Sequence, residues 1–285
     1  MDYRMFENIL NEHIFERSKS DLLRKIANEP HRYIGLFRPS KPKAKVLQNL
    51  LQSQEIRFGD ALEIIFRHYF ELLGYENLEN KMTDLTDELD LDQLFKDKDF
   101  VYFAEQKVRD DHDSTKKRGQ IDNFEKKISA LIDIYGEKKL KCFMYFVDPT
   151  LIKNKSFYEE KIESIKRDYA VFCKLCYGSE FWETLGHIDV WNELLNFLKK
   201  WRDGIPDIPS INFDIDAESA FSEIKTLPPI IYRKIFGNED ICRDIIPAIF
   251  PQKKTLKLLS AHFDELAQSK AIYQTLSEKL KERLK

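Results

Sequence analysis

Apolar residues recur at helical spacing in two parts of the N-terminal third of the chain, residues 1–28 and residues 59–73. In the second part, one stripe is formed by Leu62, Ile65, Phe66, Tyr69 and Leu73. Gly74 follows this stripe, and glycine is a common residue at helix ends. The pattern therefore predicts helices over both parts.

Two short runs with strand character come next, Glu88–Phe95 and Phe100–Lys107, and the charged residues 96–99 separate them. Such a polar break between two strands predicts a hairpin. Periodicity then predicts a helix over 120–135, a strand over 139–148, a helix over 156–168 and a strand over 170–176. The strand at 139–148 is continuously apolar, which is typical of a central strand buried on both faces.

The last part of the chain reads as helical, first over 179–202 and again from Ala217 onward. Between these regions lies a stretch with two prolines and a glycine, Gly204–Asn212, which indicates a boundary. We expect an α/β core with a mixed sheet flanked by helices in residues 1–203, and a mostly helical region in residues 204–285. The alternative is that both regions belong to one domain.

Candidate chemistry lies at the end of the second hairpin strand, in Glu105-Gln106-Lys107. Side chains alternate along a strand, so Glu105 and Lys107 share one face while Gln106 points away. A turn centred near residues 97 and 98 places Asp90 opposite Glu105. Because the register of a hairpin is uncertain by about two residues, Asp92 is the alternative partner.

Two carboxylates and an ammonium would then meet at one end of the hairpin. Carboxylate oxygens are ligands that Mg²⁺ prefers, and we expect Asp90, Glu105 and the backbone carbonyl near Gln106 to hold the ion. Mg²⁺ can activate water for attack on a phosphodiester. We expect Lys107 to keep its proton between the carboxylates and to orient the water and offset developing negative charge.

An aspartate, a hairpin and E-x-K in this order resemble the catalytic core of the PD-(D/E)XK nuclease superfamily over roughly residues 55–150. Arg57–Glu63 and Glu105–Gln120 together look like parts of a type II restriction endonuclease. The resemblance implies a restriction-endonuclease-like fold and gives Glu63 an assisting role at the metal site. One departure is Leu89, which stands where many members have proline.

The function implied is a sequence-specific, Mg²⁺-dependent endonuclease that cuts double-stranded DNA. A palindromic site requires two equivalent cuts, so we expect a homodimer. Two alternatives remain: a repair or junction-resolving nuclease with the same fold, and a non-catalytic DNA-binding protein.

Two segments are candidate DNA contacts. Residues 31–54 contain no acidic residue before Gln54, and within them Arg38, Lys41 and Lys43 form either a solvated loop or an arm that contacts phosphates. Two prolines exclude regular helix across residues 38–43. The polar segment after the catalytic strand carries residue types that read bases or contact phosphates, namely Arg109, Asp113, Ser114, Lys116, Lys117, Arg118 and Gln120. We expect specificity to reside mainly in this second segment.

Composition narrows the function further. The formal net charge of −3 gives no overall attraction to DNA, so DNA affinity requires a local cationic surface. The nine glycines include no phosphate-cradling loop, so we expect no ATP-driven chemistry. We expect neither a secretory signal nor a membrane span, and four cysteines without framework spacing favour a cytoplasmic protein.

Overall fold

The structure is a computed structural model that describes residues 1–16, 18–37, 39–83, 88–205 and 210–284. By its internal contacts the chain forms two compact units. One unit contains Met1–Leu10 and Gly59–Ile205, and the other contains Asn11–Phe58 and Pro206–Lys285. Residues 11–58, which the sequence analysis grouped with the catalytic core, thus pack with the C-terminal helices. The proposed division into domains at residues 203 and 204 stays a prediction.

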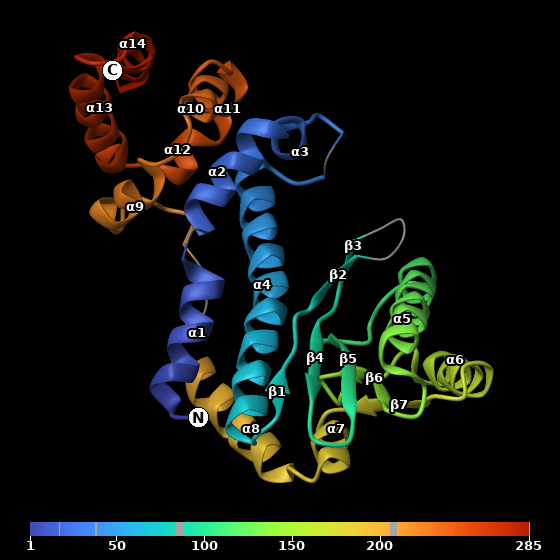
Figure 1. Ribbon diagram of the computed structural model, residues 1–285. Helices are drawn as coiled ribbons and strands as arrows, with labels where there is room; N and C mark the ends of the chain where they lie inside the picture. Colours follow the sequence, from blue (N-terminus) through green and yellow to red (C-terminus); the bar gives the residue numbers. More distant parts are fainter. Residues whose placement is uncertain (17, 38, 84–87, 206–209, 285) are drawn as a thin grey trace. The chain divides into compact units, whose positions relative to one another are not determined.

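The first unit is built on a five-stranded mixed sheet with the order β1-β4-β5-β6-β7 (Figure 1). The pairs β1–β4 and β4–β5 are antiparallel, whereas β5–β6 and β6–β7 are parallel. Its strands are β1 (Glu76–Asn77), β4 (Gln93–Lys96), β5 (Val101–Lys107), β6 (Leu140–Phe146) and β7 (Phe172–Tyr177). A separate two-stranded sheet is formed by β2 (Lys81–Thr83) and β3 (Glu88–Asp90).

Helices cover both faces of the main sheet (Figure 1). On one face, α5 (Ser114–Tyr135) and α6 (Lys155–Asp168) pack on alternate residues of the strands, such as Phe103, Cys142 and Met144. On the other face, Tyr145 stacks on Phe66 of α4 (Pro42–Leu72) and on Phe181 of α7 (Ser179–Leu185). This alternation explains why the strand predicted at 139–148 is continuously apolar: both of its faces are buried.

Two further helices contribute to this unit, α1 (Tyr3–Phe15) and α8 (Ile188–Asp203). In the unit of Asn11–Phe58 and Pro206–Lys285, the described elements are helices joined by loops, and the unit has its own apolar core, which includes Leu23, Tyr33, Tyr232 and Phe263. Its helices are α2 (Ser18–Asn28), α3 (His31–Ile34), α9 (Ala217–Ile224), α10 (Pro229–Phe236), α11 (Glu239–Asp244), α12 (Ile246–Ile249), α13 (Lys254–Ala267) and α14 (Ala271–Leu284). In the described parts of the chain, no helix is long and apolar enough to cross a membrane.

The expected fold class is confirmed: a mixed sheet flanked by helices, followed by a helical C-terminal region. Three element boundaries were wrong. Helix α4 begins at Pro42 rather than near residue 59, because proline is compatible with the first position of a helix. The run Glu88–Phe95 is split between β3 and β4. Helix α5 begins at Ser114 rather than Gln120, because Asp113 caps it.

Candidate active site

The register of the β4–β5 hairpin decides which aspartate reaches the E-x-K sequence. Gln93 pairs with Ala104 and Lys96 with Val101, so the next position along this register places Asp92 opposite Glu105. The expected pairing of Asp90 with Glu105 was therefore wrong. The turn is centred one residue later than expected, which shifts the partner by two residues. Asp90 is exposed and pairs instead with Lys81 in the two-stranded sheet.

Lys107 joins the two carboxylates of the site. Its Nζ atom lies 2.7 Å from Asp92 Oδ2 and 2.9 Å from Glu105 Oε1. The backbone N–H of Gln106 also donates to Asp92 Oδ2, at 2.8 Å. Asp92 sits at a bend just before β4, where its carboxylate can accept from both the backbone and the side chains of β5. The structure thus brings Asp92, Glu105, Gln106 and Lys107 together.

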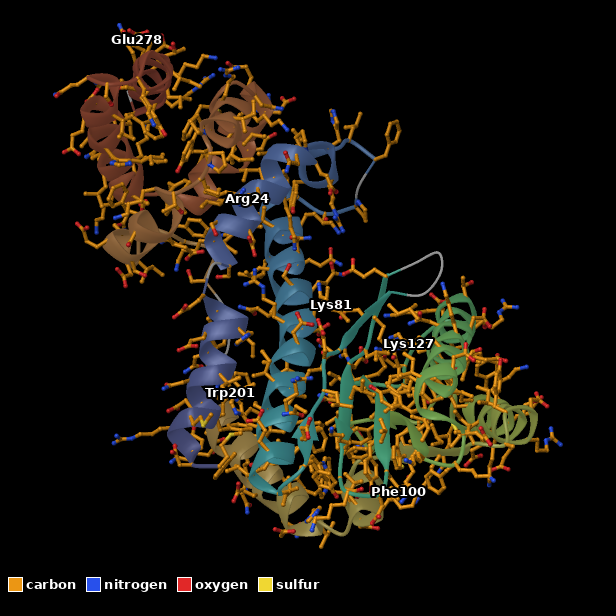
Figure 2. The ribbon with its side chains drawn as sticks, in the orientation of Figure 1. Arg24, Lys81, Phe100, Lys127, Trp201 and Glu278 are labelled. Atoms are coloured by element: carbon orange, nitrogen blue, oxygen red, sulfur yellow. The ribbon has the colours of Figure 1, made fainter. Side chains whose placement is uncertain are left out.

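A second lysine at the site was missed by the sequence analysis. Lys127 lies on the face of α5 that is directed at the sheet (Figure 2), and its Nζ atom is 2.6 Å from Glu105 Oε2. Its side chain is 5% exposed and that of Glu105 is 3% exposed. Each oxygen of the Glu105 carboxylate therefore has its own ammonium partner. The sequence contains a signal for the burial of Lys127. It stands three residues after Phe124 and four before Leu131, and so lies within the apolar stripe of the helix.

Glu63 reaches the same region from α4. Its helix is tied to the hairpin by Gln93, whose Nε2 donates to the backbone carbonyl of Glu63 at 2.9 Å and to Gln106 Oε1 at 3.0 Å. Electrostatic interactions of the Glu63 carboxyl with Asp92, Lys107 and Glu105 place it in the same charged cluster. The expected proximity of Glu63 to the hairpin is thus present, and its assisting role stays a prediction.

Burial and crowding of charge perturb these groups. Burial, followed by the repulsion of Asp92, raises the pKa of Glu63 to about 8. Burial and the neighbouring Glu105 also raise the pKa of Asp92, although Lys107 partly opposes this. For Lys107, burial disfavours the charged form, but the carboxylates of Glu105 and Asp92 outweigh it and raise the pKa above its usual value. Lys107 is therefore an ammonium at neutral pH.

The donor atoms of the site suit a hard cation. Asp92 and Glu105 offer carboxylate oxygens, and the backbone carbonyl of Gln106 lies on the same strand end. Among the described residues, no group of three or more His, Cys, Asp or Glu side chains is arranged to hold a metal. Mg²⁺ does not require such a cage, because it keeps several waters and commonly takes one or two carboxylates together with substrate phosphate. The residues present fit Mg²⁺ on these grounds.

The segment after β5 was expected to be a polar loop. Its residues from Ser114 onward instead form the start of helix α5, and hydrogen bonds hold it in place. Asp113 caps α5, because its Oδ1 accepts from the N–H groups of Thr115 and Lys116 at 3.0 and 2.9 Å. Gln120 Oε1 accepts from the hydroxyl of Tyr158 at 2.5 Å. Of the remaining candidates, Arg109 lies in the loop before α5 and is half-buried. The others lie in the first turns of α5, where Ser114, Lys116 and Arg118 are exposed and Lys117 is half-buried.

Asp110, which directly follows Arg109, anchors this segment. It is fully buried, and its carboxylate accepts from Asn154 N and Nδ2, both at 2.8 Å, and from the Tyr177 hydroxyl at 2.9 Å. These bonds fix the loop between β5 and α5 to α6 and β7. Asp110 therefore belongs to the scaffold of the segment rather than to its exposed surface.

The basic candidates of the N-terminal segment belong to the helical unit. Arg38 lies outside the described residues. Lys41 and Lys43 are exposed and line a cavity of about 710 Å³ together with Leu47, Ile211 and Pro247. Their predicted contact with DNA stays a prediction.

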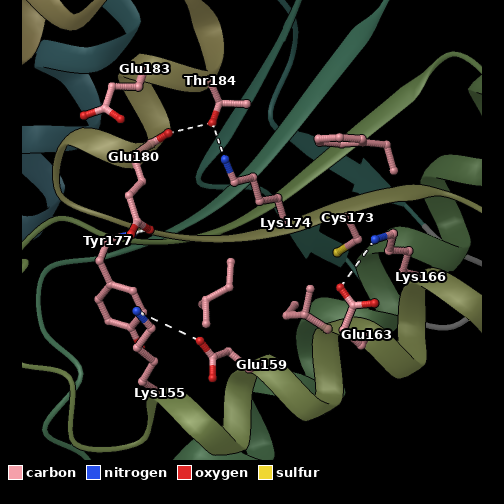
Figure 3. Close-up of a pocket in the computed structure, with 13 residues that line it drawn as sticks. Lys155, Glu159, Glu163, Lys166, Cys173, Lys174, Tyr177, Glu180, Glu183 and Thr184 are labelled. Carbon is pink, nitrogen blue, oxygen red and sulfur yellow. Dashed lines mark hydrogen bonds and ion pairs between the residues drawn. The ribbon is translucent and has the colours of Figure 1, made fainter.

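The first unit also contains a groove that the E-x-K hairpin does not line. That groove, of about 970 Å³, follows the outer strand β7 between α6 and α7 (Figure 3). Its lysines alternate with glutamates; for example, Lys166 pairs with Glu163 at 3.4 Å and Lys155 with Glu159 at 4.0 Å. The groove therefore has no excess positive charge for a nucleic acid.

The mixed sheet and its flanking helices define a restriction-endonuclease-like α/β protein. Comparison of the sequence with known families agrees with this class: the family described as "Type II restriction endonuclease, HinfI" matches residues 3–79 and 69–202. The chain belongs to this family, and the family places it among restriction endonucleases, which are nuclease hydrolases. No match to the chain was found among curated proteins or among solved structures.

Proposed function

We propose that this protein is a site-specific, Mg²⁺-dependent endonuclease of the PD-(D/E)XK type that hydrolyses phosphodiester bonds in double-stranded DNA. The observation that carries the proposal is the bridging position of Lys107, 2.7 Å from Asp92 and 2.9 Å from Glu105. Family membership supports the nuclease activity, and the site supplies the residue types that such hydrolysis needs.

Each residue has a separate task in this proposal. Asp92, Glu105 and the backbone carbonyl of Gln106 hold the cation. A bound Mg²⁺ supplies Lewis-acid chemistry and neutralises charge on the phosphate. Lys107 stays protonated beside the carboxylates, so it orients the attacking water and offsets the negative charge that develops on the phosphate oxygens. Glu63 assists from α4 as a further oxygen donor or hydrogen-bonding group.

Lys127 acts through Glu105 rather than on the substrate. Its ammonium holds Glu105 Oε2 at 2.6 Å, which fixes the rotation of the carboxylate and leaves Oε1 on the side of Lys107 and Asp92. Groups that orient a metal-binding carboxylate in this way commonly matter for both metal affinity and rate.

DNA sequence is read by the segment from Arg109 to Gln120 in this proposal, with the exposed cations of the first turns of α5 as the contacts. Asp113 organises the helix start. Arg118→Gln should lower cognate cleavage at least about tenfold, the expected loss for one base contact. Asp113→Asn should leave cleavage close to normal, because asparagine also caps helices. A large loss in Asp113→Asn together with normal cleavage in Arg118→Gln would assign base reading to Asp113 instead.

The active unit is proposed to be a homodimer, because a two-fold-symmetric DNA site requires two equivalent catalytic centres. Sedimentation of the full chain with its cognate duplex should give a complex containing two protein chains. A complex with one chain that cuts one strand at a time would contradict this.

The test of the proposed function is incubation of the full chain with long mixed-sequence duplex DNA. With Mg²⁺ we expect a fixed set of discrete fragments, and with EDTA no cleavage. Lys107→Met should produce no fragments, whereas Lys81→Met, which changes an exposed lysine of β2, should cut normally. Cleavage in EDTA, or full activity of Lys107→Met, would contradict the proposal.

A further inference from the structure

A shallow cationic pocket lies in the helical unit, which does not contain the E-x-K hairpin. It has a volume of about 830 Å³ and is lined by residues at the end of α2, the start of α3, the end of α10 and the middle of α14. Its lining includes three cationic side chains, Arg233, Lys234 and Lys279, together with His31. Within the described chain, its lining contains no Asp or Glu.

The pocket differs from the other charged surfaces of the molecule in how its cations are paired. Elsewhere in the same unit, Arg243 pairs with Asp240 and Asp244, and Lys281 pairs with Asp264. In the part of the chain that the structure describes, neither Arg233 nor Lys279 has an ion-pair partner. The positive charge of this pocket is therefore not neutralised locally.

Helix dipoles explain only part of this arrangement. Arg233 and Lys234 lie in the last turn of α10, where cations are favoured next to the terminal carbonyls. Lys234 Nζ also hydrogen-bonds Asn28 Oδ1 at 2.8 Å. Lys279, however, comes from the middle of another helix, so its position is not explained by the end of α10.

Gly237, which follows α10, is also part of the pocket lining. A Cβ atom at this position would lie 2.6 Å from the carbonyl oxygen of Arg233 and 3.7 Å from Lys279 Nζ. A side chain there would clash with the backbone and extend toward the ammonium. The Arg233 carbonyl thus requires glycine here, and as a consequence no side chain from position 237 lies beside the Lys279 ammonium.

We propose that this pocket binds a phosphate group of the DNA backbone and so gives the helical unit a direct share in substrate binding. Unpaired cations on an open surface are suited to a phosphodiester, which offers charge and hydrogen-bond acceptors without sequence information. This inference rests on the proposed function, and it extends DNA contact to residues after 202, where the family match ends.

The test is the salt dependence of DNA binding by the full chain in EDTA, between about 50 and 200 mM KCl. Arg233→Gln/Lys279→Gln should reduce the slope of log K against log salt by about 1–2 and weaken binding on the order of tenfold at low salt, since each neutralised phosphate contributes about 0.9 to the slope. The matched control, Arg243→Gln/Lys281→Gln, removes two exposed, paired cations of the same unit and should leave the slope unchanged. Circular dichroism and the unfolding midpoint check that both variants are folded.

Three outcomes would overturn the inference. The first is an unchanged slope in the folded Arg233→Gln/Lys279→Gln variant, and the second is an equal reduction in the control. The third is that inorganic phosphate stabilises the wild type but not this variant, while the salt slope of DNA binding by the variant stays normal. The pocket would then bind free phosphate rather than the DNA backbone. A wild type that cleaves DNA while the slope is unchanged contradicts only this inference, whereas a wild type that neither binds nor cleaves DNA contradicts the proposed function itself.

Discussion

Two lysine–glutamate pairs, one in the two-stranded sheet and one on β5, show how burial changes the effect of the same charged residues. Lys81 of β2 and Glu88 of β3 form a diagonal ion pair 4.0 Å apart, with side chains 63% and 71% exposed. Lys107 and Glu105 on β5 are 2.9 Å apart, with side chains 27% and 3% exposed. Exposed pairs are screened by water and contribute little. Beside the buried pair, the pKa of Asp92 is raised first by burial and then by the repulsion of Glu105, while Lys107 opposes the rise.

The difference follows from the sheets to which the strands belong. Strand β5 lies between β4 and β6 in the main sheet, and α5 covers the face that carries Glu105. Among the described residues, strand β3 pairs with β2 alone. The same residue types therefore form a solvated pair in one place and a charged cluster in the other.

The largest expected effect comes from removing the buried carboxylate charge. Glu105→Gln should reduce cleavage about 10³-fold or more, because it removes both a cation ligand and the counter-charge of two lysines. Glu88→Gln, the matched change in the exposed pair, should cut within about twofold of the wild type. Initial cleavage rates of a cognate duplex at saturating Mg²⁺ measure both. Equal rates in the two variants would remove the distinction between the pairs.

A smaller loss is expected at Lys127. Lys127→Met should lower activity about 10–100-fold, the range for groups that orient a metal ligand. It should also destabilise the fold, because Glu105 is left buried with one partner fewer. Lys126→Met changes the neighbouring, less buried lysine and serves as the control.

A double-mutant cycle with Glu105→Gln separates positioning from packing at Lys127. If Lys127 acts through Glu105, its substitution should cost far less activity and stability in the Glu105→Gln background. Full additivity of the two changes would show that Lys127 acts independently of Glu105.

The smallest effect concerns the pH dependence of stability in EDTA. Burial and Asp92 raise the pKa of Glu63 from 4.5 to about 8, so the folded state holds a proton that the unfolded state has released. The stability contribution of Glu63 is complete below about pH 4.5 and is lost as pH rises to about 8. Glu63→Gln keeps the neutral form, so its free energy of unfolding relative to the wild type should grow steadily between pH 5 and pH 8.5. Urea unfolding at both pH values measures this, and exposed Glu71→Gln should show no such growth.

The E-x-K strand was predictable because strand alternation is a local property. Glu105 and Lys107 share a face in any β-strand. The fold class was accessible for the same reason, since long periodic segments are the most readable elements of a sequence.

The register was not predictable, because it depends on pairing that is remote in sequence. Residues 88–90 leave the hairpin to pair with β2, and the chain bends at Asp92 before β4 begins. Nothing in the alternation of Glu88–Phe95 marks that change of partner. Lys127 was hidden for a related reason: a buried lysine requires a carboxylate from another element, which only the tertiary structure supplies. The start of α5, by contrast, could have been found from Asp113 followed by serine and threonine, residues typical of helix caps.

The most direct test of the account is cleavage of one cognate duplex by Asp92→Asn and Asp90→Asn, which change two aspartates that are two residues apart in opposite environments. Asp92→Asn should be inactive, with a rate at least about 10³-fold below the wild type, because it loses the carboxylate charge that Lys107 and the cation share. Asp90→Asn should cut within about twofold of the wild type, because Asp90 is exposed in the two-stranded sheet. An inactive Asp90→Asn together with an active Asp92→Asn would contradict the proposed site.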